Sequence, residues 1–485
     1  MPDASKYNEL DASIINKLKK ICGSDFVITD KDLMESYTHD ELSPAEVEGE
    51  YPDVLVKPDS SEKISEIMKL ANENLIPVTP IGGRTGLTGG MIPVYGGIGL
   101  SLERLNKTIE VDEDNLMVEV DAGVSMEKLY DAVEEKGLTL PIHPTTEDSQ
   151  VGGTIAANAG GEATLKHGVM RDYVKGLEVV LPDGEIMNIG GKLLKDNTGY
   201  SLLHLVIGCE GTLGIITKAI LRLYPSSEQS RFIIVPFEAG ENAISTVPEI
   251  IKSGITPAGI EYLEGDTILS GEEKVNERWP TEKGEATLMI IVTGEEEDEI
   301  LNKAQKIMEI CEKKGAVDAF LATKRKEMEK IMKIREGIAE VIQEGNVTGH
   351  RSGDLVVTPS KIPEFIKKAR EIFKESGVEG TFYAFGHAGD GNVHLEGKLP
   401  DENVDWDKVK ELRAQWLQTA IDMGGDITGE HGIGLIKKPE LRKFKSPKMI
   451  QLMESIKKSF DPNNILNPGK IVGEDEEMEN KFIKI

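Results

Sequence analysis

The chain has 485 residues, a formal net charge of −29 and three cysteines. This length exceeds what one ordinary hydrophobic core supports, so we expect two domains. The excess of acid argues against a nucleic-acid partner, which clustered Lys and Arg would hold, and the scattered cysteines exclude a disulfide framework or an iron–sulfur cluster ligated by this chain alone. The apolar stretches are strand-sized and the N-terminal segment lacks the order of a secretory signal, which predicts a cytoplasmic protein without a membrane span.

Four segments follow one another along the chain. Residues 1–50 indicate a helical leader. Residues 51–225 alternate short apolar strands, glycine-rich turns and brief helices, which is typical of an α+β domain. Residues 226–423 predict a second domain of sheet and helices, and residues 424–485 a C-terminal segment.

The second domain begins with the order β-α-β-β-α-β, which is that of a ferredoxin-like unit. The strands are expected at Arg231–Phe237, near Glu261, at 286–293 and at 317–321, with helices near 239–253 and at 296–314. A partial echo follows, with strands at 354–359 and 381–387 and helices near 362–375 and 404–423.

Three glycine-rich segments lie in the first domain. The first runs from Pro80 to Gly90, and its five glycines let successive backbone N–H groups turn toward one anion, such as a pyrophosphate. Its spacing matches neither the dinucleotide fingerprint nor the ATPase phosphate loop, which disfavours nicotinamide and ATP. Alone, such a loop is as consistent with a structural turn as with a ligand cradle. Segments 144–161 and 208–217 share its small, hydroxyl-bearing composition, which favours the cradle.

In content and order these segments resemble the FAD-binding domain of the vanillyl-alcohol oxidase and p-cresol methylhydroxylase superfamily. The resemblance implies a two-part α+β FAD-binding domain whose loops hold the flavin. Some members tether FAD through a histidine in the first loop, but residues 80–90 contain none, which favours noncovalent FAD; we interpret His143 and His167, beside the second loop, as polar loop residues. The residues that the resemblance implies for FAD binding are Pro80, Gly82, Gly83, Arg84, Thr85, Gly86, Gly89, Gly90, Pro144, Thr145, Thr146, Ser149, Gly152, Gly153, Thr154, Ala157, Asn158, Gly160, Gly161, Glu210, Gly211, Gly214, Ile215, Ile216 and Asn467.

Two histidine motifs lie in the C-terminal half. His387 and His394 are separated by an Asp-Gly turn that would bring two strands back together. Glu430 lies directly before His431 in a second glycine-flanked motif. Two imidazoles and a carboxylate are a common set of ligands for a divalent metal, and they accept Zn²⁺, Fe²⁺ or Mn²⁺. An isolated histidine would more often be structural, but the gathering of three of the eight histidines in two such motifs favours a metal site.

These motifs resemble the branch of that superfamily that contains D-lactate dehydrogenase, glycolate oxidase and D-2-hydroxyglutarate dehydrogenase, over about Tyr37 to Val472. The resemblance implies a ferredoxin-like substrate (cap) domain and a C-terminal segment that returns to the flavin. It also implies that His387, His394 and Glu430 bind one divalent metal ion and that His431 is the catalytic base. Arg335 matches the arginine that binds the substrate carboxylate, although a helical arginine paired to Glu336 or Glu340 is the ordinary alternative.

The implied reaction is oxidation of a small D-2-hydroxy acid to the 2-oxo acid, with hydride transfer to flavin N5. Hydroxyglutarate members carry a threonine and a lysine after the arginine, where this chain has Ala339 and a region containing Arg351, so we expect D-lactate first and glycolate next. The expected acceptor is a separate protein, an electron-transferring flavoprotein or an iron–sulfur subunit. D-2-hydroxyglutarate oxidation, metal-independent oxidation of another alcohol and a catalytically silent subunit are the alternatives.

Overall fold

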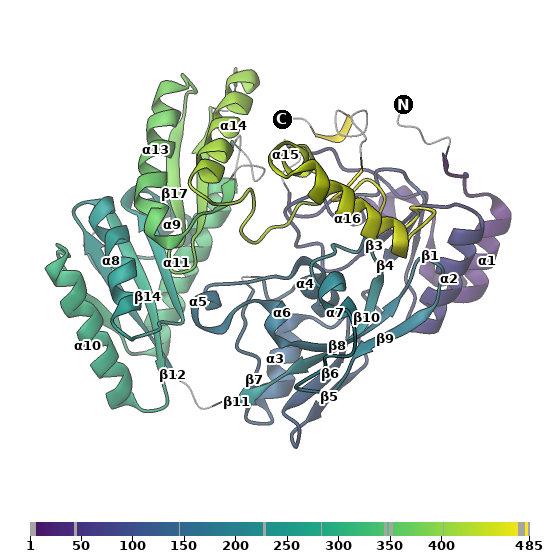
Figure 1. Cartoon of the computed structure of the whole chain (residues 1–485), viewed down its shortest axis with the longest axis horizontal. Helices are drawn as coiled ribbons and strands as arrows, with labels where there is room; N and C mark the ends of the chain where they lie inside the picture. Colours follow the sequence, from purple (N-terminus) through teal and green to yellow (C-terminus); the bar gives the residue numbers. More distant parts are fainter. Residues whose placement is uncertain are drawn as a thin grey trace. The chain divides into compact units, whose positions relative to one another are not determined.

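The computed structural model describes residues 6–42, 46–144, 146–226, 229–282, 284–343, 347–348, 353–400, 402–473 and 481–483 (Figure 1). The chain forms two compact units. Unit 1 consists of Met1–Gly160, Val169–Ser226 and His431–Ile485, and unit 2 of Gly161–Gly168 and Ser227–Glu430. Among the described helices, none combines the length and the apolar composition that a membrane span requires.

The described residues of unit 1 form three sheets. The first has the order β1-β2-β4-β3, in which β2, β4 and β3 are parallel and β1 is antiparallel to β2. The second is an antiparallel sheet of order β5-β6-β10-β8-β9, and β11 pairs with β7 in the third. The bounds are β1 Val27–Ile28, β2 Val54–Val56, β3 Val78–Ile81, β4 Ile98–Ser101, β5 Ile109–Asp112, β6 Met117–Asp121, β7 Leu138–Thr139, β8 Val174–Val180, β9 Ile186–Gly190, β10 Ile215–Arg222 and β11 Tyr224–Pro225.

The helices α1 to α4, α6 and α7 of unit 1 contribute buried apolar residues to one large cluster that includes the strands of these sheets. In α1, for example, Ile14, Leu18 and Cys22 recur every four residues and are buried, and the Asp11 side chain caps the helix by accepting from the Ile14 N–H at 2.8 Å. The helices are α1 Ala12–Cys22, α2 Ser61–Glu73, α3 Met126–Glu134, α4 Val151–Ala157, α6 Met170–Tyr173, α7 Leu202–Val206, α15 Lys438–Phe444 and α16 Pro447–Phe460, with 3₁₀ turns η2 Ser24–Phe26, η3 Lys31–Leu33 and η4 Glu35–Tyr37.

The C-terminal segment of the chain completes the edge of β3, the strand that leads into the first glycine-rich loop. Val78 N–H donates to the Ile465 carbonyl at 2.8 Å, and Asn467 N–H donates to the Val78 carbonyl at 2.7 Å. A segment almost 400 positions away in sequence therefore fixes the start of that loop.

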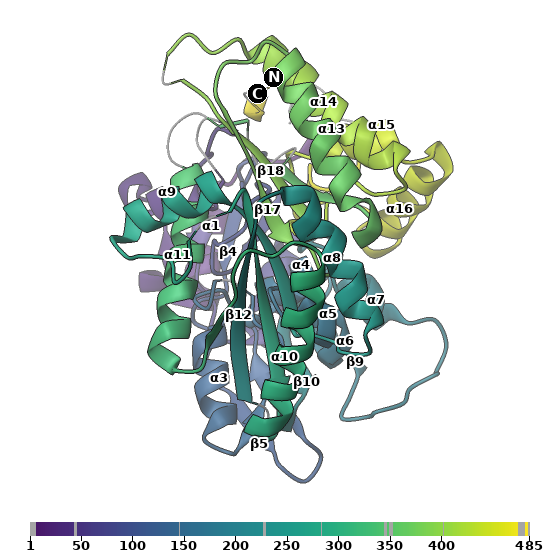
Figure 2. The same cartoon turned by 90° about the vertical axis from the view of Figure 1, so that its left-hand side faces the viewer.

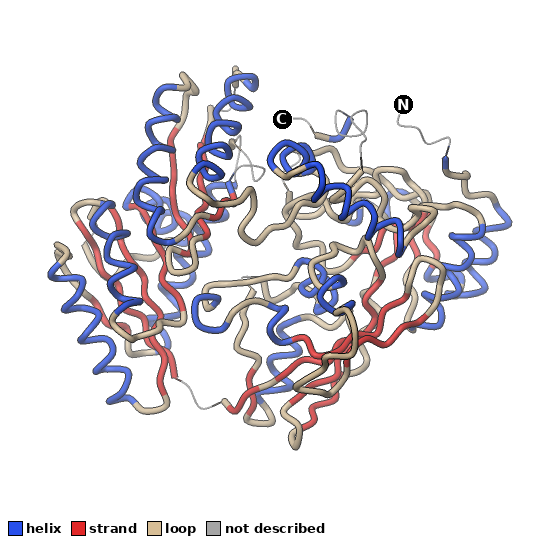
Figure 3. Tube along the Cα trace, viewed as in Figure 1, coloured by secondary structure: helices blue, strands red, loops and turns tan. Residues whose placement is uncertain are grey.

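The described part of unit 2 is built on one sheet, whose strands are drawn in red in Figure 3. Its order is β15-β12-β14-β13-β17-β18-β16, and its neighbouring strands are all antiparallel. The strand order β15-β12-β14-β13 is that of a ferredoxin-like unit, as expected. The predicted β-α-β-β-α-β element order missed one helix, because α9 (Gly265–Val275) lies between β13 and β14. The strand bounds are β12 Gln229–Phe237, β13 Gly259–Glu264, β14 Ala286–Gly294, β15 Phe320–Ala322, β16 Asp354–Val356, β17 Thr381–His387 and β18 Asn392–Lys398.

Helices cover both faces of the first strands of this sheet: Figure 2 shows α9 and α11 on one side of β12 and α8 and α10 on the other. Burial on both faces explains why β12 and β14 read as continuous apolar runs without alternation. The helices are α5 Thr164–His167, α8 Gly240–Lys252, α9 Gly265–Val275, α10 Glu297–Lys313, α11 Arg325–Gln343, α13 Ile362–Glu375 and α14 Trp406–Asp422, with η5 Pro359–Lys361.

Candidate active site

The first two glycine-rich segments line one cavity of about 360 Å³ in unit 1. Loop 82–85 forms one wall, and residues of segment 146–150 form another. Its lining residues are Glu41, Gly82, Gly83, Arg84, Thr85, Glu103, Thr146, Asp148 and Gln150. The two predicted cradle segments are therefore brought together, although they are more than 60 residues apart.

The glycines of this cradle serve two different purposes. A Cβ on Gly152 would lie 2.7 Å from the Ala122 Cβ, and one on Gly83 would lie 3.1 Å from the Gln150 backbone nitrogen, so both glycines allow close packing of the chain on itself. A Cβ on Gly153 meets nothing within 4 Å. Gly153 and Ala157 lie one turn apart on α4, both exposed, and present a flat face of small residues.

This surface fits a bound polar ligand. Gln150 Oε1 is buried and accepts no hydrogen bond from the described residues, which is the condition that a ligand donor would relieve. Arg84 supplies a cation at the cavity wall; its guanidinium lies over the Tyr37 ring, 4.8 Å from the centroid. Three lining residues are acidic, Glu41, Glu103 and Asp148, and Glu103 is paired with Lys57 at 2.8 Å. Arg84 and the glycine-rich backbone, and not the acidic part of the wall, are therefore the groups that suit the anionic part of a dinucleotide such as FAD.

The third glycine-rich segment is hydrogen-bonded to the C-terminal segment of the chain. Glu210 accepts the backbone N–H groups of Ile433 and Gly434 at 2.8 and 2.6 Å, and burial raises the pKa of this carboxyl. Asn467 Nδ2 donates to the carbonyls of Gly90 and Glu210 at 3.0 and 2.9 Å. These bonds tie the C-terminal segment to the first and third loops.

Other residues that the resemblance implied for FAD lie in the framework of unit 1. Ile215 and Ile216 are buried in β10, opposite Val180 and Val179 of β8, and a Cβ on Gly214 would lie 2.3 Å from the Val179 Cγ1. Thr145 falls outside the described residues. Of the remaining members, Pro80 lies in β3, Thr154 lies within α4, and Gly161 belongs to unit 2. The others lie in loops and turns of unit 1: Gly86, Gly89, Pro144, Ser149, Asn158, Gly160 and Gly211.

In unit 2 a hairpin brings the two predicted histidine ligands together. His387 ends β17 and His394 lies in β18, on either side of the turn at 388–391, and their ring centroids are 5.7 Å apart. Glu430 Oε1 lies 3.6 Å from His387 Nε2 and 3.3 Å from His394 Nε2. The structure thus gathers His387, His394 and Glu430, as the sequence predicted, and two imidazole nitrogens and a carboxylate face one point.

The histidines and carboxylates of this group shift one another's pKa values. Burial disfavours the protonated form of His387, but Glu261 and Glu430 outweigh it and hold its pKa well above the usual range. Burial would raise the pKa of Glu430, yet His387 and His394 hold it well below the usual range. A cation at this point is favoured by the same carboxylates, which is consistent with a metal site.

Asp354, at the start of β16, organises the loop that carries Glu430. It is fully buried, and its Oδ1 accepts from Asn392 Nδ2 at 2.8 Å and from the backbone N–H groups of Gly429 and Glu430 at 3.1 and 3.2 Å. Its Oδ2 accepts from the Thr428 hydroxyl at 2.6 Å. With four donors already directed at its two oxygens, this carboxylate is better suited to holding the loop than to binding an ion.

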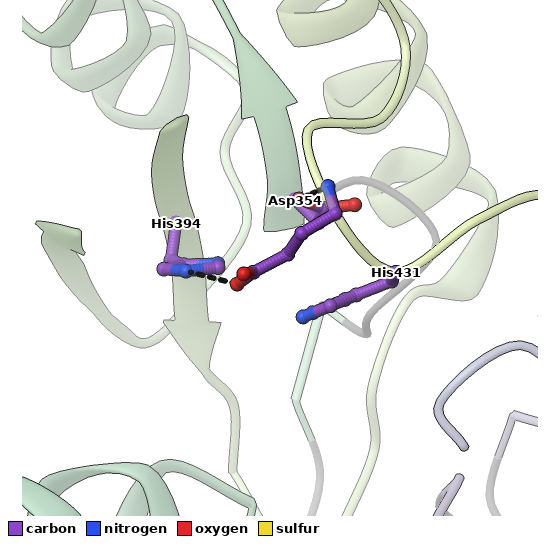
Figure 4. Close-up of side chains that lie close together, drawn as sticks. Asp354, His394 and His431 are labelled. Atoms are coloured by element: carbon purple, nitrogen blue, oxygen red, sulfur yellow. Dashed lines mark hydrogen bonds and ion pairs between the residues drawn. The ribbon is translucent and has the colours of Figure 1, made fainter. Parts of the chain in front are cut away.

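His431 follows Glu430 directly, and Figure 4 shows the imidazoles of His394 and His431 extending toward the carboxylate drawn between them. The ligand atoms of Asp354, His394, Glu430 and His431 all lie within 4.8 Å of one another. His431 therefore lies next to two of the three predicted metal ligands, His394 and Glu430. His387 is not part of this group, and His431 could itself offer a ligand atom to an ion there.

Arg335, on α11, is buried beside this group. Its Nε donates to Glu261 Oε2 at 3.0 Å, its guanidinium lies 5.4 Å from the centroid of the Phe385 ring, and the other oxygen of Glu261 contacts His387 Nδ1. Burial would raise the pKa of Glu261, but His387 and Arg335 together lower it to about 2. Glu336 and Glu340 were the alternative partners that the sequence offered for Arg335, but its Nε donates to Glu261 instead.

The sequence did not single out Asp354 or Glu261. Glu261 lies within GIEYLE, where acidic residues are interspersed with apolar ones as in a strand with one wet face, and Asp354 precedes an apolar strand. In the sequence, each appears only as an acidic residue in or beside a strand-like run. Such a residue indicates a functional site only once the strand is known to be buried on both faces.

The chain matches models of two protein domains. Residues 52–190 match the FAD binding domain, and residues 226–471 match the C-terminal domain of FAD linked oxidases. Among curated relatives, a D-lactate dehydrogenase of Archaeoglobus fulgidus is 42% identical over 86% of this chain and 91% of its own length. The glycolate oxidase subunit GlcD of Bacillus subtilis is 38% identical over 87% and 90%, and a D-2-hydroxyglutarate dehydrogenase of Xanthomonas citri is 32% identical over 87% and 89%.

Solved structures share the fold at lower identity. A 4-ethylphenol oxidase of Gulosibacter chungangensis superposes with a TM-score of 0.75 at 20% identity, covering 99% of this chain and all of that chain. The p-cresol methylhydroxylase structure gives 0.74 at 18% identity, covering 95% and 96%. The expected two-domain α+β architecture of this superfamily is confirmed.

Proposed function

Because the chain belongs to the family of FAD-linked oxidases, we propose that it oxidises a small D-2-hydroxy acid, D-lactate in the first place and glycolate next, to the 2-oxo acid. The observation that carries this proposal is the convergence of His387, His394 and Glu430 beside His431, because a hydroxy acid needs both a group that holds its hydroxyl oxygen and a base that removes its proton. Curated relatives named for D-lactate and glycolate support the substrate class.

The residues divide the work as follows. His431 accepts the hydroxyl proton at an imidazole nitrogen, the group that most often serves as a general base. Arg335 holds the substrate carboxylate; since its Nε is engaged by Glu261, the terminal Nη groups are the donors for this contact. His387, His394 and Glu430 would hold a divalent ion, Zn²⁺, Fe²⁺ or Mn²⁺, and such an ion lowers the pKa of the hydroxyl that it binds.

The cradle of unit 1 would hold FAD without a covalent bond, since loop 80–90 contains no histidine. Bound FAD supplies the hydride acceptor at N5. Small residues at Gly153 and Ala157 allow close approach of the cofactor, and Gln150 offers an acceptor that the described protein groups leave unused. Electrons would then leave to a separate protein, an electron-transferring flavoprotein or an iron–sulfur subunit, because three single, buried cysteines provide no cluster of the chain's own.

Anaerobic mixing of the purified flavoprotein with hydroxy acids tests the proposal. We expect the flavin absorbance to bleach with D-lactate fastest, with glycolate next, and slowly with D-2-hydroxyglutarate and L-lactate. Bleaching fastest with D-2-hydroxyglutarate would reassign the substrate. Flavin that dithionite reduces but none of these acids reduces would contradict the proposed reaction.

A metal-independent alcohol oxidoreductase is the principal alternative. The same screen, repeated after dialysis against a chelator, separates the two: the proposal requires loss of bleaching together with the metal and its return when the metal is restored, whereas the alternative requires undiminished bleaching in metal-free protein.

A further inference from the structure

One carboxylate in unit 2 contacts both a predicted metal ligand and the predicted substrate-binding arginine. Glu261 lies in the middle of the sheet, in β13, and is completely buried. Its two oxygens have different partners: Oε1 contacts His387 Nδ1, and Oε2 accepts from Arg335 Nε at 3.0 Å. A buried carboxylate with a separate hydrogen-bond partner on each oxygen has little freedom to turn.

The contact with His387 fixes which ring nitrogen can bind an ion. With Nδ1–H donating to Glu261, the lone pair lies on Nε2, and Nε2 is the atom 3.6 Å from Glu430 Oε1. Carboxylates in this position hold the tautomer and the ring orientation of metal-binding histidines and make them more basic. The sheet register itself places Glu261 opposite His387 across β13 and β17.

The contact with Arg335 orients the guanidinium. Because Nε is turned toward Glu261, the plane of the guanidinium is fixed and its two terminal groups are directed elsewhere, while the Phe385 ring covers the guanidinium at 5.4 Å from the centroid. The same carboxylate thus restrains the ring of His387 and the fork of Arg335.

We propose that Glu261 is a positioning residue that fixes His387 as a metal ligand and Arg335 as a carboxylate clamp at the same time. This inference rests on the proposed function. It implies that loss of Glu261 weakens metal binding even though Glu261 is not itself a ligand, and weakens substrate binding even when the metal is saturating.

The chain provides a matched control on the same strand. Glu264 is also buried and is also paired with an arginine, Arg370, and its Oε1 accepts from the Tyr262 hydroxyl at 3.2 Å. Since side chains three positions apart on a strand point to opposite faces, Glu264 faces away from the histidines. Substitution of Glu264 therefore tests the loss of a buried carboxylate without touching the proposed site.

The test compares wild type, E261Q and E264Q as FAD-loaded proteins, with bound Zn²⁺ measured by mass spectrometry over a series of buffered free-Zn²⁺ concentrations. A glutamine has one acceptor oxygen for two donors, and its amide group would face one of them. We expect the midpoint for E261Q to rise by about 10- to 100-fold, with FAD content unchanged and the E264Q midpoint close to wild type. At saturating Zn²⁺, KM for D-lactate should also rise in E261Q.

The outcomes separate the two claims. If the Zn²⁺-binding midpoints of wild type and E261Q lie within about threefold of each other, the change is well below that expected when a partner of a metal ligand is lost. This result overturns the role of Glu261 and leaves the proposed function in place. Wild type that binds no Zn²⁺, Fe²⁺ or Mn²⁺ overturns the metal centre and this inference together. If E261Q does not fold, E261D takes its place in the comparison: its carboxylate is drawn back by one methylene, so a smaller but clear increase in the midpoint is expected, and a wild-type midpoint counts against the inference.

Discussion

Replacing Asp354 tests whether the loop that carries Glu430 is held by this one carboxylate. Asp354→Ala removes the acceptor of four hydrogen bonds, three of them from donors whose positions are fixed by the backbone or by a buried amide. The Thr428 hydroxyl can rotate to another acceptor, but the other three donors remain. Only the Asn392 amide is a buried donor, and leaving it without its partner costs about 1–3 kcal/mol. The Gly429 and Glu430 N–H groups are partly accessible to water, so each lost bond costs about 0.5–1.5 kcal/mol, and the total loss in the free energy of unfolding should be about 2–6 kcal/mol.

Asp354→Asn should lose less. The asparagine oxygen can still accept from the three fixed donors, and the Thr428 hydroxyl can turn to accept from the new amide group. What is lost is the charge of the acceptor, about 0.5–1 kcal/mol for each bond, or about 2 kcal/mol in all. The assay is urea unfolding of metal-free protein, followed by tryptophan fluorescence, since Trp279 and Trp416 are both buried in unit 2.

Metal-free protein is essential for this measurement, because Asp354 also belongs to the group whose ligand atoms lie within 4.8 Å of one another. If Asp354 positions the loop, the alanine variant is destabilised without any metal. If metal-free D354A is as stable as wild type and only metal retention is abolished, Asp354 is a ligand and its role as the anchor of the loop is refuted.

Two further predictions concern unit 1: one compares two neighbouring glycines of the cradle, and the other follows stability against pH at a buried lysine. Gly153→Val should release FAD but leave the thermal stability of the FAD-free protein unchanged, because its Cβ enters open space. Gly152→Val should lower the stability of the FAD-free protein, because its Cβ meets the Ala122 Cβ at 2.7 Å. Retention of FAD by G153V, measured by absorbance after gel filtration, would contradict the cradle. Burial lowers the pKa of Lys470 to about 7, and its Nζ donates to the Ile92 carbonyl at 2.6 Å. The pKa of Lys470 is lower in the folded than in the unfolded chain, so above about pH 7 the unfolded state binds more protons and the folded state becomes more stable as the pH rises. In urea unfolding between about pH 7 and 8.5, wild type should therefore gain up to about 1.4 kcal/mol per pH unit relative to Lys470→Met. Parallel pH profiles of the two proteins would refute the shift.

Most of the strand and helix order of unit 2 could be read from the sequence because each element is long and bounded by polar turns. Local patterns indicated the four strands β12 to β15 and the helices α8 and α10, but not α9 between β13 and β14. The Asp-Gly turn between His387 and His394 indicated the hairpin that joins β17 and β18. The gathering of Glu430 with these histidines was implied by the resemblance, since no local pattern relates positions 387, 394 and 430.

The outer groups of the site could not be read in this way. Glu261 stands among apolar neighbours as a solvent-facing strand residue would, yet it is buried, and Arg335 of α11 contacts it on that face of the sheet. The role of Asp354 depends on a loop 75 residues further along the chain. In the glycine-rich loops, composition predicted a cradle, but only the packing distances distinguish Gly152, which serves the fold, from Gly153, which faces open space.

The central claim is that His431 is the base of a metal-assisted oxidation of a hydroxy acid, and single-turnover flavin reduction tests it most directly. Wild type and His431→Asn, both loaded with FAD and metal, are mixed anaerobically with D-lactate in a stopped-flow instrument. We expect the variant to keep both cofactors and to reduce its flavin more slowly by about 10²- to 10⁴-fold, the usual loss when a general base is removed. A rate within about threefold of wild type would be too small a loss for a removed base and would contradict the assignment.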